Sequence, residues 1–306
     1  MTMTQMGFCI VGHRGVVRVG GDDRVAFLQG LISNDVERVS SDRAVHAALL
    51  TPQGRFLWDM TVVARDDSFL LEVERDRAAA LAKKLTIYKL RSKVTVADLG
   101  ESMEVAVAFG PGAAGALGLP EEAGAARTLD DGVALVDPRL PALGVRVLAP
   151  QGHAAALLSA KGFAALPFDD YENLRIGLGV PDGSRDLPVE KALLLENGFD
   201  ELNGVDWKKG CYMGQELTAR TKYRALIKKR LLPVSVEGPL PAPGTPVTLD
   251  GQEAGEIRSG IGGHALALLR LDAVERARGA VEGLTAGGAK LRPVPPDWVR
   301  LPAAEG

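Results

Sequence analysis

Residues 209–216 are Lys-Gly-Cys-Tyr-Met-Gly-Gln-Glu, and this octapeptide holds one of the two cysteines in the 306-residue chain. Glycines stand on both sides of Cys211, and two lysines, Lys208 and Lys209, precede it. The pattern predicts a tight turn followed by a short helix that begins at Gln215. Nearby cations and a helix N-terminus favour the thiolate, the form of cysteine that attacks electrophiles and binds metals. On this pattern alone, a half-exposed cysteine in an ordinary loop is an equally good interpretation.

Length, charge and cysteine content limit the class of protein. The chain is long enough for about two or three domains. Its formal charge of −3 argues against a dominant nucleic-acid surface. Two cysteines, Cys9 and Cys211, are too few for a disulfide framework, which suits a reducing compartment. Residues 1–11 do not resemble a secretory signal, and no apolar stretch approaches the roughly 20 residues that span a bilayer. We therefore expect a soluble, cytoplasmic protein that has no membrane partner.

Hydrophobic patterns along the first two thirds of the chain predict an α+β arrangement, in which antiparallel strands carry helices on one face. Helices are expected from Asp22 or Asp23 to about residue 33, over 76–90, within 113–127, over 154–161 and from about 169 to 177. Strands are expected at 8–11, 15–19, 44–50, 56–64, 69–73, 93–97, 103–109, 133–136 and 144–148. Residues 180–205 show no clear periodicity. Because long irregular segments in compact domains are usually functional, we expect this segment to line a site.

The C-terminal third is expected to form a separate β domain. Four alternating stretches, at 231–236, 245–249, 253–259 and 264–270, predict a small antiparallel barrel or sandwich. The boundary before it falls near Lys228, and residues 295–306 are expected to form a tail.

A run of six cations lies just before and at this boundary: Arg220, Lys222, Arg224, Lys228, Lys229 and Arg230. A solvated connector is the favoured interpretation. Attraction of a carboxylate-bearing ligand tail comes second, because carboxylates suit arginine. RNA binding comes third, because Tyr223 is the only aromatic residue interleaved with these cations. Nucleic acid is therefore not an expected partner.

The sequence patterns of several well-known types of functional site are absent from this chain. No phosphate-binding P-loop and no glycine-rich dinucleotide turn are present. The four histidines are scattered without metal-ligand spacing, and we expect each to be structural or at the surface. No histidine lies near Cys211 in sequence, so the sequence does not point to a Cys–His nucleophile pair.

The octapeptide is similar to the signature Lys-Gly-Cys-Tyr-x-Gly-Gln-Glu of the YgfZ family of folate-binding iron–sulfur assembly proteins. These are relatives of the aminomethyltransferase T-protein of the glycine cleavage system. The matching signature positions are Lys209, Gly210, Cys211, Tyr212, Gly214, Gln215 and Glu216. Five shorter stretches resemble family segments in the same order, at 28–36 (where Gly-Leu replaces part of the pattern), 51–55, 88–94, 188–190 and 255–260. The resemblance covers nearly the whole chain.

This resemblance implies a fold and a task. The fold consists of two interleaved α+β subdomains, in residues 1–228, and a C-terminal antiparallel β-barrel, in residues 229–294, around a central hole that holds tetrahydrofolate. The task is the assembly or repair of iron–sulfur proteins, mainly 4Fe–4S enzymes, which would be the clients.

Cys211 is the residue that we expect to carry the chemistry. An iron–sulfur cluster usually needs four thiolates or their equivalents, and this chain offers only Cys211 and a distant Cys9. We therefore expect Cys211 to be a transient cluster ligand, shared with an A-type iron–sulfur carrier that brings its own cysteines.

The resemblance also suggests folate contacts. Residues 54–62 are similar to a T-protein segment whose acidic pair contacts folate, but Trp58 replaces the first acid and only Asp59 remains. A carboxylate accepts the N–H groups of a pterin ring, and Glu190 is a second candidate. Alternatively, Asp59 is an outward-facing polar residue and Glu190 a surface carboxylate. The other pocket candidates are Asn34, Tyr88 and Arg91, for which a helix C-cap (Asn34) and surface positions are equally good interpretations.

Two other functions compete with an assembly factor that has no turnover of its own. A tetrahydrofolate-dependent aminomethyltransferase is the enzyme alternative, but the transferase branch has Phe at the position of Tyr212 and does not call for the cysteine. The halved acidic pair also favours the assembly factor. A cysteine-independent scaffold for an oxidoreductase is the third class.

Overall fold

The protein is described by a computed structural model that covers residues 5–223, 227–277 and 283–301. The chain divides into two compact units, each made of two separate stretches. The first unit consists of residues 1–171 and 202–215, and the second of residues 172–201 and 216–306. No helix in the described ranges is long and apolar enough to cross a membrane.

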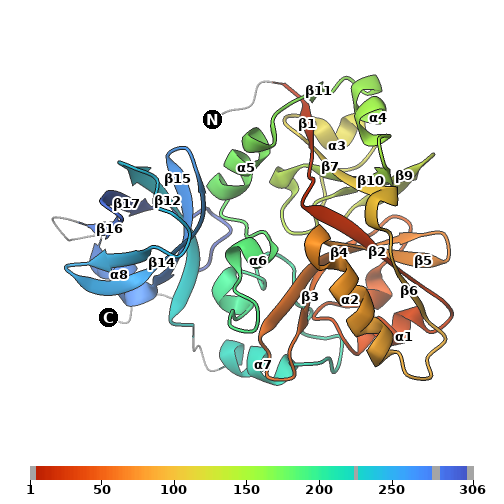
Figure 1. The fold of residues 1–306 in the computed structure, drawn as a ribbon, viewed down its shortest axis with the longest axis horizontal. Helices are drawn as coiled ribbons and strands as arrows, with labels where there is room; N and C mark the ends of the chain where they lie inside the picture. The colour runs from red at the N-terminus through yellow and green to blue at the C-terminus, as the bar shows by residue number, and fades with distance from the viewer. Residues whose placement is uncertain (1–4, 224–226, 278–282, 302–306) are drawn as a thin grey trace. The chain divides into compact units, whose positions relative to one another are not determined.

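The first unit contains a five-stranded antiparallel sheet with the strand order β3-β4-β5-β2-β6 (Figure 1). Its strands are β2 (Arg14–Gly20), β3 (Val45–Leu50), β4 (Phe56–Arg65), β5 (Ser68–Glu74) and β6 (Thr95–Asp98). Helix α2 (Arg75–Tyr88) packs against this sheet and buries Ala78, Leu81 and Leu85, which recur at helical spacing. The short helix α1 (Arg24–Gln29) precedes β3 in the chain.

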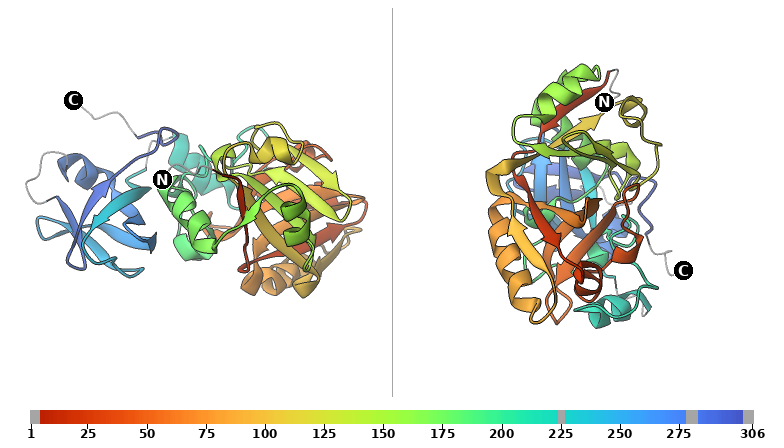
Figure 2. Two further views of the ribbon diagram at one scale, coloured as in Figure 1. Left: turned by 90° about the horizontal axis from the view of Figure 1, so that it is seen from above. Right: turned by 90° about the vertical axis from the view of Figure 1, so that its right-hand side faces the viewer.

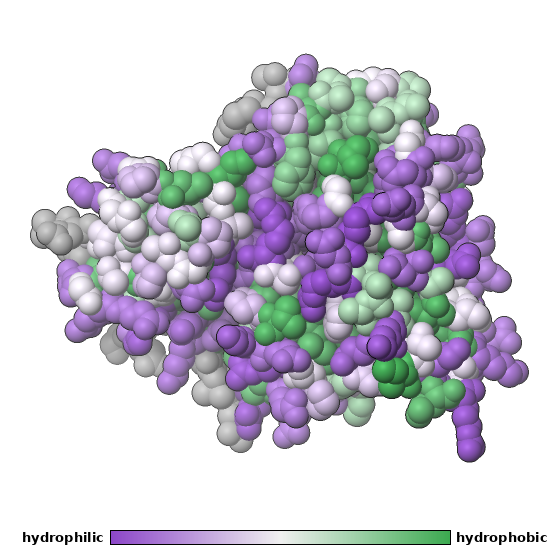
Figure 3. All heavy atoms as spheres, in the orientation of Figure 1, coloured by the Kyte–Doolittle hydropathy of each residue, from purple (hydrophilic) through white to green (hydrophobic). Residues whose placement is uncertain are grey.

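A six-stranded sheet completes the first unit, with the order β11-β1-β7-β10-β9-β8. Its strands are β1 (Gly7–Ile10), β7 (Met103–Phe109), β8 (Ala126–Leu129), β9 (Gly132–Val136), β10 (Val145–Pro150) and β11 (Ala164–Ala165). Helices α3 (Ala113–Ala116) and α4 (Ala154–Ala160) pack on it, and Phe8, Leu117 and Leu158 belong to the shared core. Apolar residues also gather at the surface over these two helices (Figure 3).

The second unit is built around a closed barrel with the strand order β12-β15-β14-β13-β16-β17 (Figure 2). The strands are β12 (Lys229–Glu237), β13 (Pro246–Leu249), β14 (Gln252–Ile261), β15 (His264–Arg270), β16 (Leu284–Ala286) and β17 (Ala289–Pro293). Alternate residues such as Leu232, Val247 and Ile257 point into its core. Helix α8 (Leu271–Ala277) also contributes to this core.

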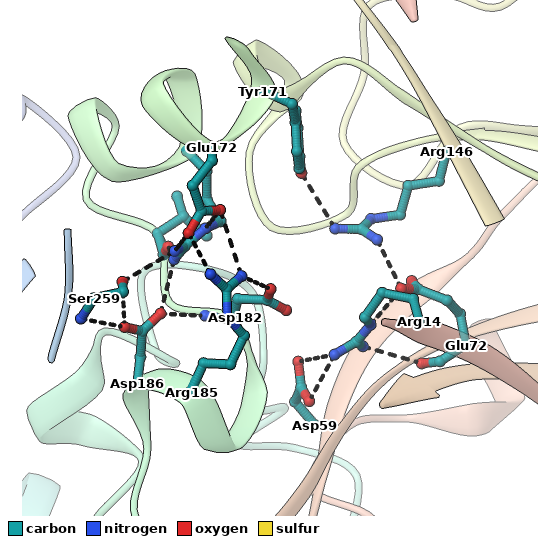
Figure 4. Close-up of polar contacts among 12 residues, drawn as sticks. Arg14, Asp59, Glu72, Arg146, Tyr171, Glu172, Asp182, Arg185, Asp186 and Ser259 are labelled. Carbon is teal, nitrogen blue, oxygen red and sulfur yellow. Dashed lines mark hydrogen bonds and ion pairs between the residues drawn. The ribbon is translucent and has the colours of Figure 1, made fainter. Parts of the chain in front are cut away.

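A buried arginine joins the helical segment of the second unit to the barrel. Arg175, on α5 (Phe168–Gly177), is only 1 % exposed. Its guanidinium donates to Glu172 Oε1 over 2.6 Å and to Asp186 Oδ2, at the end of α6 (Gly183–Asp186), over 2.7 Å. It also donates to Ser259 Oγ on β14 over 3.0 Å (Figure 4). Buried charges are tolerated only when paired in this way.

The structure confirms the expected antiparallel strand pairing, apart from β11, which pairs with β1 in parallel, and it confirms the long α2 and the C-terminal β-barrel. Some boundaries were wrong. Helix α1 ends at Gln29 rather than near residue 33, because Gly30 is its C-cap. The helix expected within 113–127 is only α3, since the glycines that follow turn the chain toward β8. The irregular segment contains α6 and a 3-10 turn, Leu195–Asn197.

Two expectations concern residues near the chain's C-terminal part. Arg224 of the basic run and residues 302–306 of the expected tail lie outside the described residues. Within the expected tail, Trp298 donates its indole N–H to Leu178 O over 2.8 Å. The predicted domain boundaries at 228/229 and 294/295 stay predictions.

We predict that Arg175→Ala lowers the free energy of unfolding by about 3–5 kcal/mol, because it leaves the buried Asp186 carboxylate without its cation and removes one of the two cations that pair with Glu172. Arg185→Ala is the matched control. Arg185 also pairs with Glu172, over 2.7 Å, but its side chain is 37 % exposed, so its loss should cost less than about 1 kcal/mol. Urea unfolding followed by circular dichroism measures both. Equal losses in the two variants would contradict the structural role given to Arg175.

Candidate functional site

The lysine of the octapeptide holds the cysteine loop against α1. The ammonium of Lys209 donates to Gln29 O over 2.8 Å and to Ile32 O over 2.6 Å, which are carbonyls at and just beyond the end of α1. It also lies 5.2 Å from the centroid of the Tyr212 ring. Burial lowers the pKa of Lys209 to about 8, against the attraction of Asp35 and Asp206. The lysine therefore satisfies backbone carbonyls that a helix end leaves without partners.

The glycines of the octapeptide are required by the backbone. Gly214 has a φ of +81°, and a Cβ there would lie 2.4 Å from Thr51 O, so no side chain fits. The amide of Met213 donates to Gly30 O over 3.1 Å. Gly210 has a φ of +87° with open space around it, so its need for glycine is conformational. The predicted tight turn is confirmed, and it rests on α1 and on the 51–54 turn.

The predicted helix after the turn is also confirmed. Helix α7 (Gln215–Tyr223) begins at the expected residue. The Gln215 side chain accepts a hydrogen bond from the Tyr212 amide over 3.2 Å, which ties the helix start back to the turn. Glu216 is exposed in the first turn of α7.

The two cysteines lie in opposite environments. Cys211 is exposed at the tip of this loop. Cys9, on β1, is 4 % exposed, and burial raises the pKa of its thiol to about 12, so it stays protonated. Among the described residues, no group of three or more His, Cys, Asp or Glu side chains is placed to hold a metal ion. The accessible thiol of the molecule is therefore that of Cys211.

Asn34 uses its amide to fix the segment that leads into the octapeptide. Its Nδ2 donates to His46 O and to Asn203 O, each over 2.7 Å, and its Oδ1 accepts from the amide of Asp35 over 2.7 Å. The neighbouring Ser33 hydroxyl donates to Gly204 O over 2.6 Å. The alternative interpretation of Asn34 as a helix C-cap is wrong, because Gly30 caps α1.

Asp59 lies on the face of β4 that turns away from α2. Its neighbour Trp58 donates to Arg77 O on α2 over 3.3 Å, and successive strand residues point to opposite faces. Asp59 is only 4 % exposed and lies 3.3 Å from Arg14 Nη1 (Figure 4). The alternative interpretation of Asp59 as an outward-facing residue is therefore wrong.

Two of the other folate candidates, Tyr88 and Arg91, do not gather around Asp59. Tyr88 and Arg91 lie at the C-terminal end of α2, on the other face of the five-stranded sheet, and line an open hollow beside Asp23. Glu190 belongs to the second unit, where it has a φ of +61° in the irregular segment. Both Asn34 and Asp59 interact with His46. The backbone carbonyl of His46 accepts the hydrogen bond from Asn34, and the charge of Asp59 acts to raise the pKa of the His46 ring.

Sequence reasoning missed a buried ionic network beside Asp59. Glu72 Oε1 accepts from Arg14 Nε and from Arg146 Nη1, each over 2.7 Å. Arg146 also donates to Asp137 Oδ2 over 2.8 Å, and Arg139 donates to the same carboxylate. These arginines hold the pKa of Asp137 well below its usual range, against the cost of burial. A single charged residue inside an apolar strand, as in Val145-Arg146-Val147, was the feature of the sequence that could have predicted this network.

Comparison with known proteins supports the fold and identifies relatives. Residues 228–301 match the family described as CAF17, C-terminal beta-barrel domain. The chain is 39 % identical to iron–sulfur cluster assembly factor IBA57, mitochondrial, of Homo sapiens, over 93 % of this chain and 83 % of that protein. It is 38 % identical to the Mus musculus factor of the same name, over 86 % and 77 %. The IBA57 homologue of Mycosarcoma maydis is 34 % identical, over 87 % and 74 %.

A solved structure shares the fold. The glycine cleavage system aminomethyltransferase T from Bartonella henselae superposes with a TM-score of 0.77, over 97 % of this chain and 87 % of that one. Sequence identity is 17 %, so the likeness concerns the fold alone. It confirms the expected T-protein-like α+β fold with its C-terminal barrel.

The expectation of a cytoplasmic protein is contradicted by these comparisons. The human, mouse and fungal relatives named above are all described as mitochondrial proteins. The expectation rested largely on cysteine usage, which separates reducing from oxidising compartments but does not tell one reducing compartment from another.

We predict an acid-sensitive stability that depends on His46. Burial lowers the pKa of this histidine from 6.5 to about 4, so the unfolded chain binds its proton first as the pH falls. Its contribution to stability is complete above pH 6.5 and is lost toward pH 4, by up to about 3 kcal/mol. His46→Asn should flatten this part of the curve, measured as urea unfolding between pH 7 and 4.5. Parallel curves for the two proteins would refute the assignment.

Proposed function

Because the chain belongs to the IBA57 family of iron–sulfur cluster assembly factors, we propose that it takes part in cluster assembly by lending Cys211 as a shared, exchangeable ligand. The relation to iron–sulfur assembly inferred from the octapeptide is confirmed at the level of this family. The finer assignment to the YgfZ family stays a prediction, as do the cysteine's role and the folate.

The observation that carries this proposal is the presentation of Cys211. Its thiol is exposed, while the backbone on both sides of it is fixed by Lys209 and by Met213. A fixed backbone lowers the entropy lost when a ligand is captured, and an exposed thiol can be reached by a partner's metal. A cysteine that acts as a catalytic nucleophile needs a neighbouring base. In the described part of the chain, no histidine forms a hydrogen bond with the Cys211 thiol, which favours the ligand role.

The number of thiolates argues for a partner. A cluster that is bound by four thiolates needs more cysteines than the two in this chain. One of these two, Cys9, is buried, and its thiol has a raised pKa. The other ligands must therefore come from another molecule. We propose an A-type iron–sulfur carrier as that partner, with client iron–sulfur enzymes as the receivers of the cluster. In this scheme the cluster is cargo and the protein performs no turnover of its own.

Tetrahydrofolate is proposed as a bound cofactor on the side of the five-stranded sheet that carries Asp59. The chemistry fits this ligand, because the carboxylate of Asp59, which is 4 % exposed and paired with Arg14, can accept pterin N–H groups. Both amide hydrogens of Asn34 are donated to backbone carbonyls, so we propose that Asn34 holds the neighbouring backbone in place and does not contact the folate. Glu190, which belongs to the second unit, stays a prediction as a folate ligand. Folate would supply a one-carbon carrier when bound.

The aminomethyltransferase alternative is not supported by the residues beside Asp59. Trp58 replaces the first acid of the transferase pair, and its indole packs beneath Arg77, 4.6 Å from ring centroid to guanidinium carbon. This position is thus committed to α2 packing.

We predict that Cys211→Ser abolishes the cluster species shared with an A-type carrier. A serine hydroxyl is a poor ligand for iron compared with a thiolate. The test is anaerobic reconstitution of a mixture of the two proteins with iron and sulfide, followed by visible absorption and circular dichroism. Cys9→Ala is the matched control and should retain the species, because Cys9 is buried. An unchanged spectrum with Cys211→Ser would disprove the shared-ligand role.

We predict that Asp59→Asn weakens tetrahydrofolate binding by about ten- to a hundredfold, the value of a hydrogen bond to a charged acceptor. Anaerobic isothermal titration calorimetry measures it, with the melting temperature as the check on folding. Arg91→Ala, on the other face of the sheet, should bind within about twofold of the unmodified protein. Absence of folate binding to the unmodified protein, or equal binding by Asp59→Asn, would remove the folate from the proposal.

A further inference from the structure

The C-terminal end of α2 and the turn after it form a strongly basic surface. Residues 83–93 contain five cations, and residues 77–97 contain no Asp or Glu, although the whole chain has a net charge of −3. Lys83, Arg91 and Lys93 are exposed, and their side chains form no hydrogen bond or ion pair with other described residues. This local excess of positive charge is therefore not neutralised within the described part of the molecule.

Two large apolar side chains stand among these cations. Leu90 is 86 % exposed, the highest value among large hydrophobic residues in the described ranges, and Ile87 is 62 % exposed. Apolar residues are visible at the surface over this end of α2, beside hydrophilic ones (Figure 3). We call this surface, made of Lys83, Ile87, Leu90, Arg91 and Lys93, the α2 patch. Apolar groups rimmed by charge are typical of interaction sites.

The exposure of Leu90 is enforced by its backbone. Leu90 follows the helix cap Lys89 and has a φ of +46°, a conformation in which glycine is normally found and a leucine is strained. The turn around it is well fixed, because Ser92 N donates to Lys89 O over 2.7 Å and the Asp23 carboxylate accepts from Lys93 N over 2.7 Å. A bulky apolar residue in a strained, fixed and exposed position adds nothing to the folded core.

The surface beside Leu90 is concave. An open hollow of ≈ 720 Å³ is lined by Asp23, Tyr88, Lys89, Leu90, Arg91 and Ser92. Tyr88 offers an aromatic wall, held by Lys84, whose ammonium lies 5.4 Å from the ring centroid. The hollow is therefore apolar along Tyr88 and Leu90, and its polar lining holds two cations, Lys89 and Arg91, and one carboxylate, Asp23.

We propose that the α2 patch is a docking site for an acidic segment of a partner protein that inserts an apolar side chain beside Leu90. The cations of the rim pair with the acidic residues, and the apolar side chain covers Ile87 and Leu90. Charge complementarity of this kind raises association rates and fixes orientation, while apolar burial supplies affinity. The inference does not depend on the role proposed for Cys211.

A protein fits this surface better than a membrane does. Membrane binding grows with the buried apolar area, and two side chains supply little of it. A hollow of this size instead accepts a side chain from a partner, as helix-in-groove interfaces do. The strain at Leu90 also places one apolar group at a fixed point, which a fluid bilayer does not require.

The test uses the full-length protein and a fluorescein-labelled peptide of about a dozen residues, with leucines at i, i+3 and i+4 among glutamates. A second peptide carries serine in place of each leucine. Fluorescence anisotropy at physiological salt should show the leucine peptide binding at least about tenfold more tightly. Equal binding of the two peptides would reduce the patch to nonspecific charge attraction and overturn the proposal.

Leu90→Gly is the decisive variant. Glycine suits the positive φ, so the melting temperature should stay equal or rise by a few degrees. Affinity for the leucine peptide should fall about tenfold. Arg91→Glu combined with Lys93→Glu should weaken binding and reduce its salt dependence. Lys290→Glu and Val294→Ser, which change exposed residues of the second unit, are matched controls and should bind the peptide normally.

Two further measurements distinguish other occupants. Sedimentation with phosphatidylserine vesicles tests a membrane, and analytical ultracentrifugation tests a second copy of the chain. If Leu90→Gly abolishes vesicle binding or self-association while peptide binding is absent or unchanged, the proposed protein partner is wrong. Retained peptide affinity in Leu90→Gly would overturn the proposal outright.

Discussion

The first unit depends on one buried carboxylate. Glu72 stands on the five-stranded sheet, is fully buried, and accepts from Arg14 of its own sheet and from Arg146 of the six-stranded sheet. Each sheet thus contributes a charge that the other must neutralise. Such pairing adds little net stability compared with apolar packing, but losing one partner leaves an uncompensated buried charge. These ion pairs fix the position of one sheet against the other. Because Asp59 pairs with Arg14, they also fix the position of Asp59.

Much of the fold was predictable because its signals are local. Strand alternation, the 3.6-residue period of α2 and the glycines of the octapeptide each specify their structure within a few residues. The short strands β8, β11, β16 and β17 were missed; β11 and β16, with two and three residues, are shorter than the roughly four residues over which alternation can be recognised. Helix α1 was overestimated because its apolar pattern continues past Gly30, where the backbone turns to meet β3.

The candidate site was predictable in part. The octapeptide located Cys211, but the reasons for its residues came from the structure: Lys209 satisfies carbonyls some 180 positions earlier, and Gly214 leaves room for Thr51 O. Contacts of that sequence separation leave no periodicity to recognise. Tyr88 and Arg91 were grouped with Asp59 by resemblance. The sheet separates them, because the alternation that sends Trp58 toward α2 sends Asp59 to the opposite face.

The interleaved course of the chain has a consequence for synthesis. The chain passes between the units after residues 171, 201 and 215, so the first unit is completed by a segment made some thirty residues after its main body. Until residues 202–215 leave the ribosome, the carbonyls at the end of α1 and the polar groups of Ser33 and Asn34 lack their native partners. The turn that carries Cys211 is thus the last part of the first unit to be synthesised. Its thiol can take its native position only after the rest of that unit has been made.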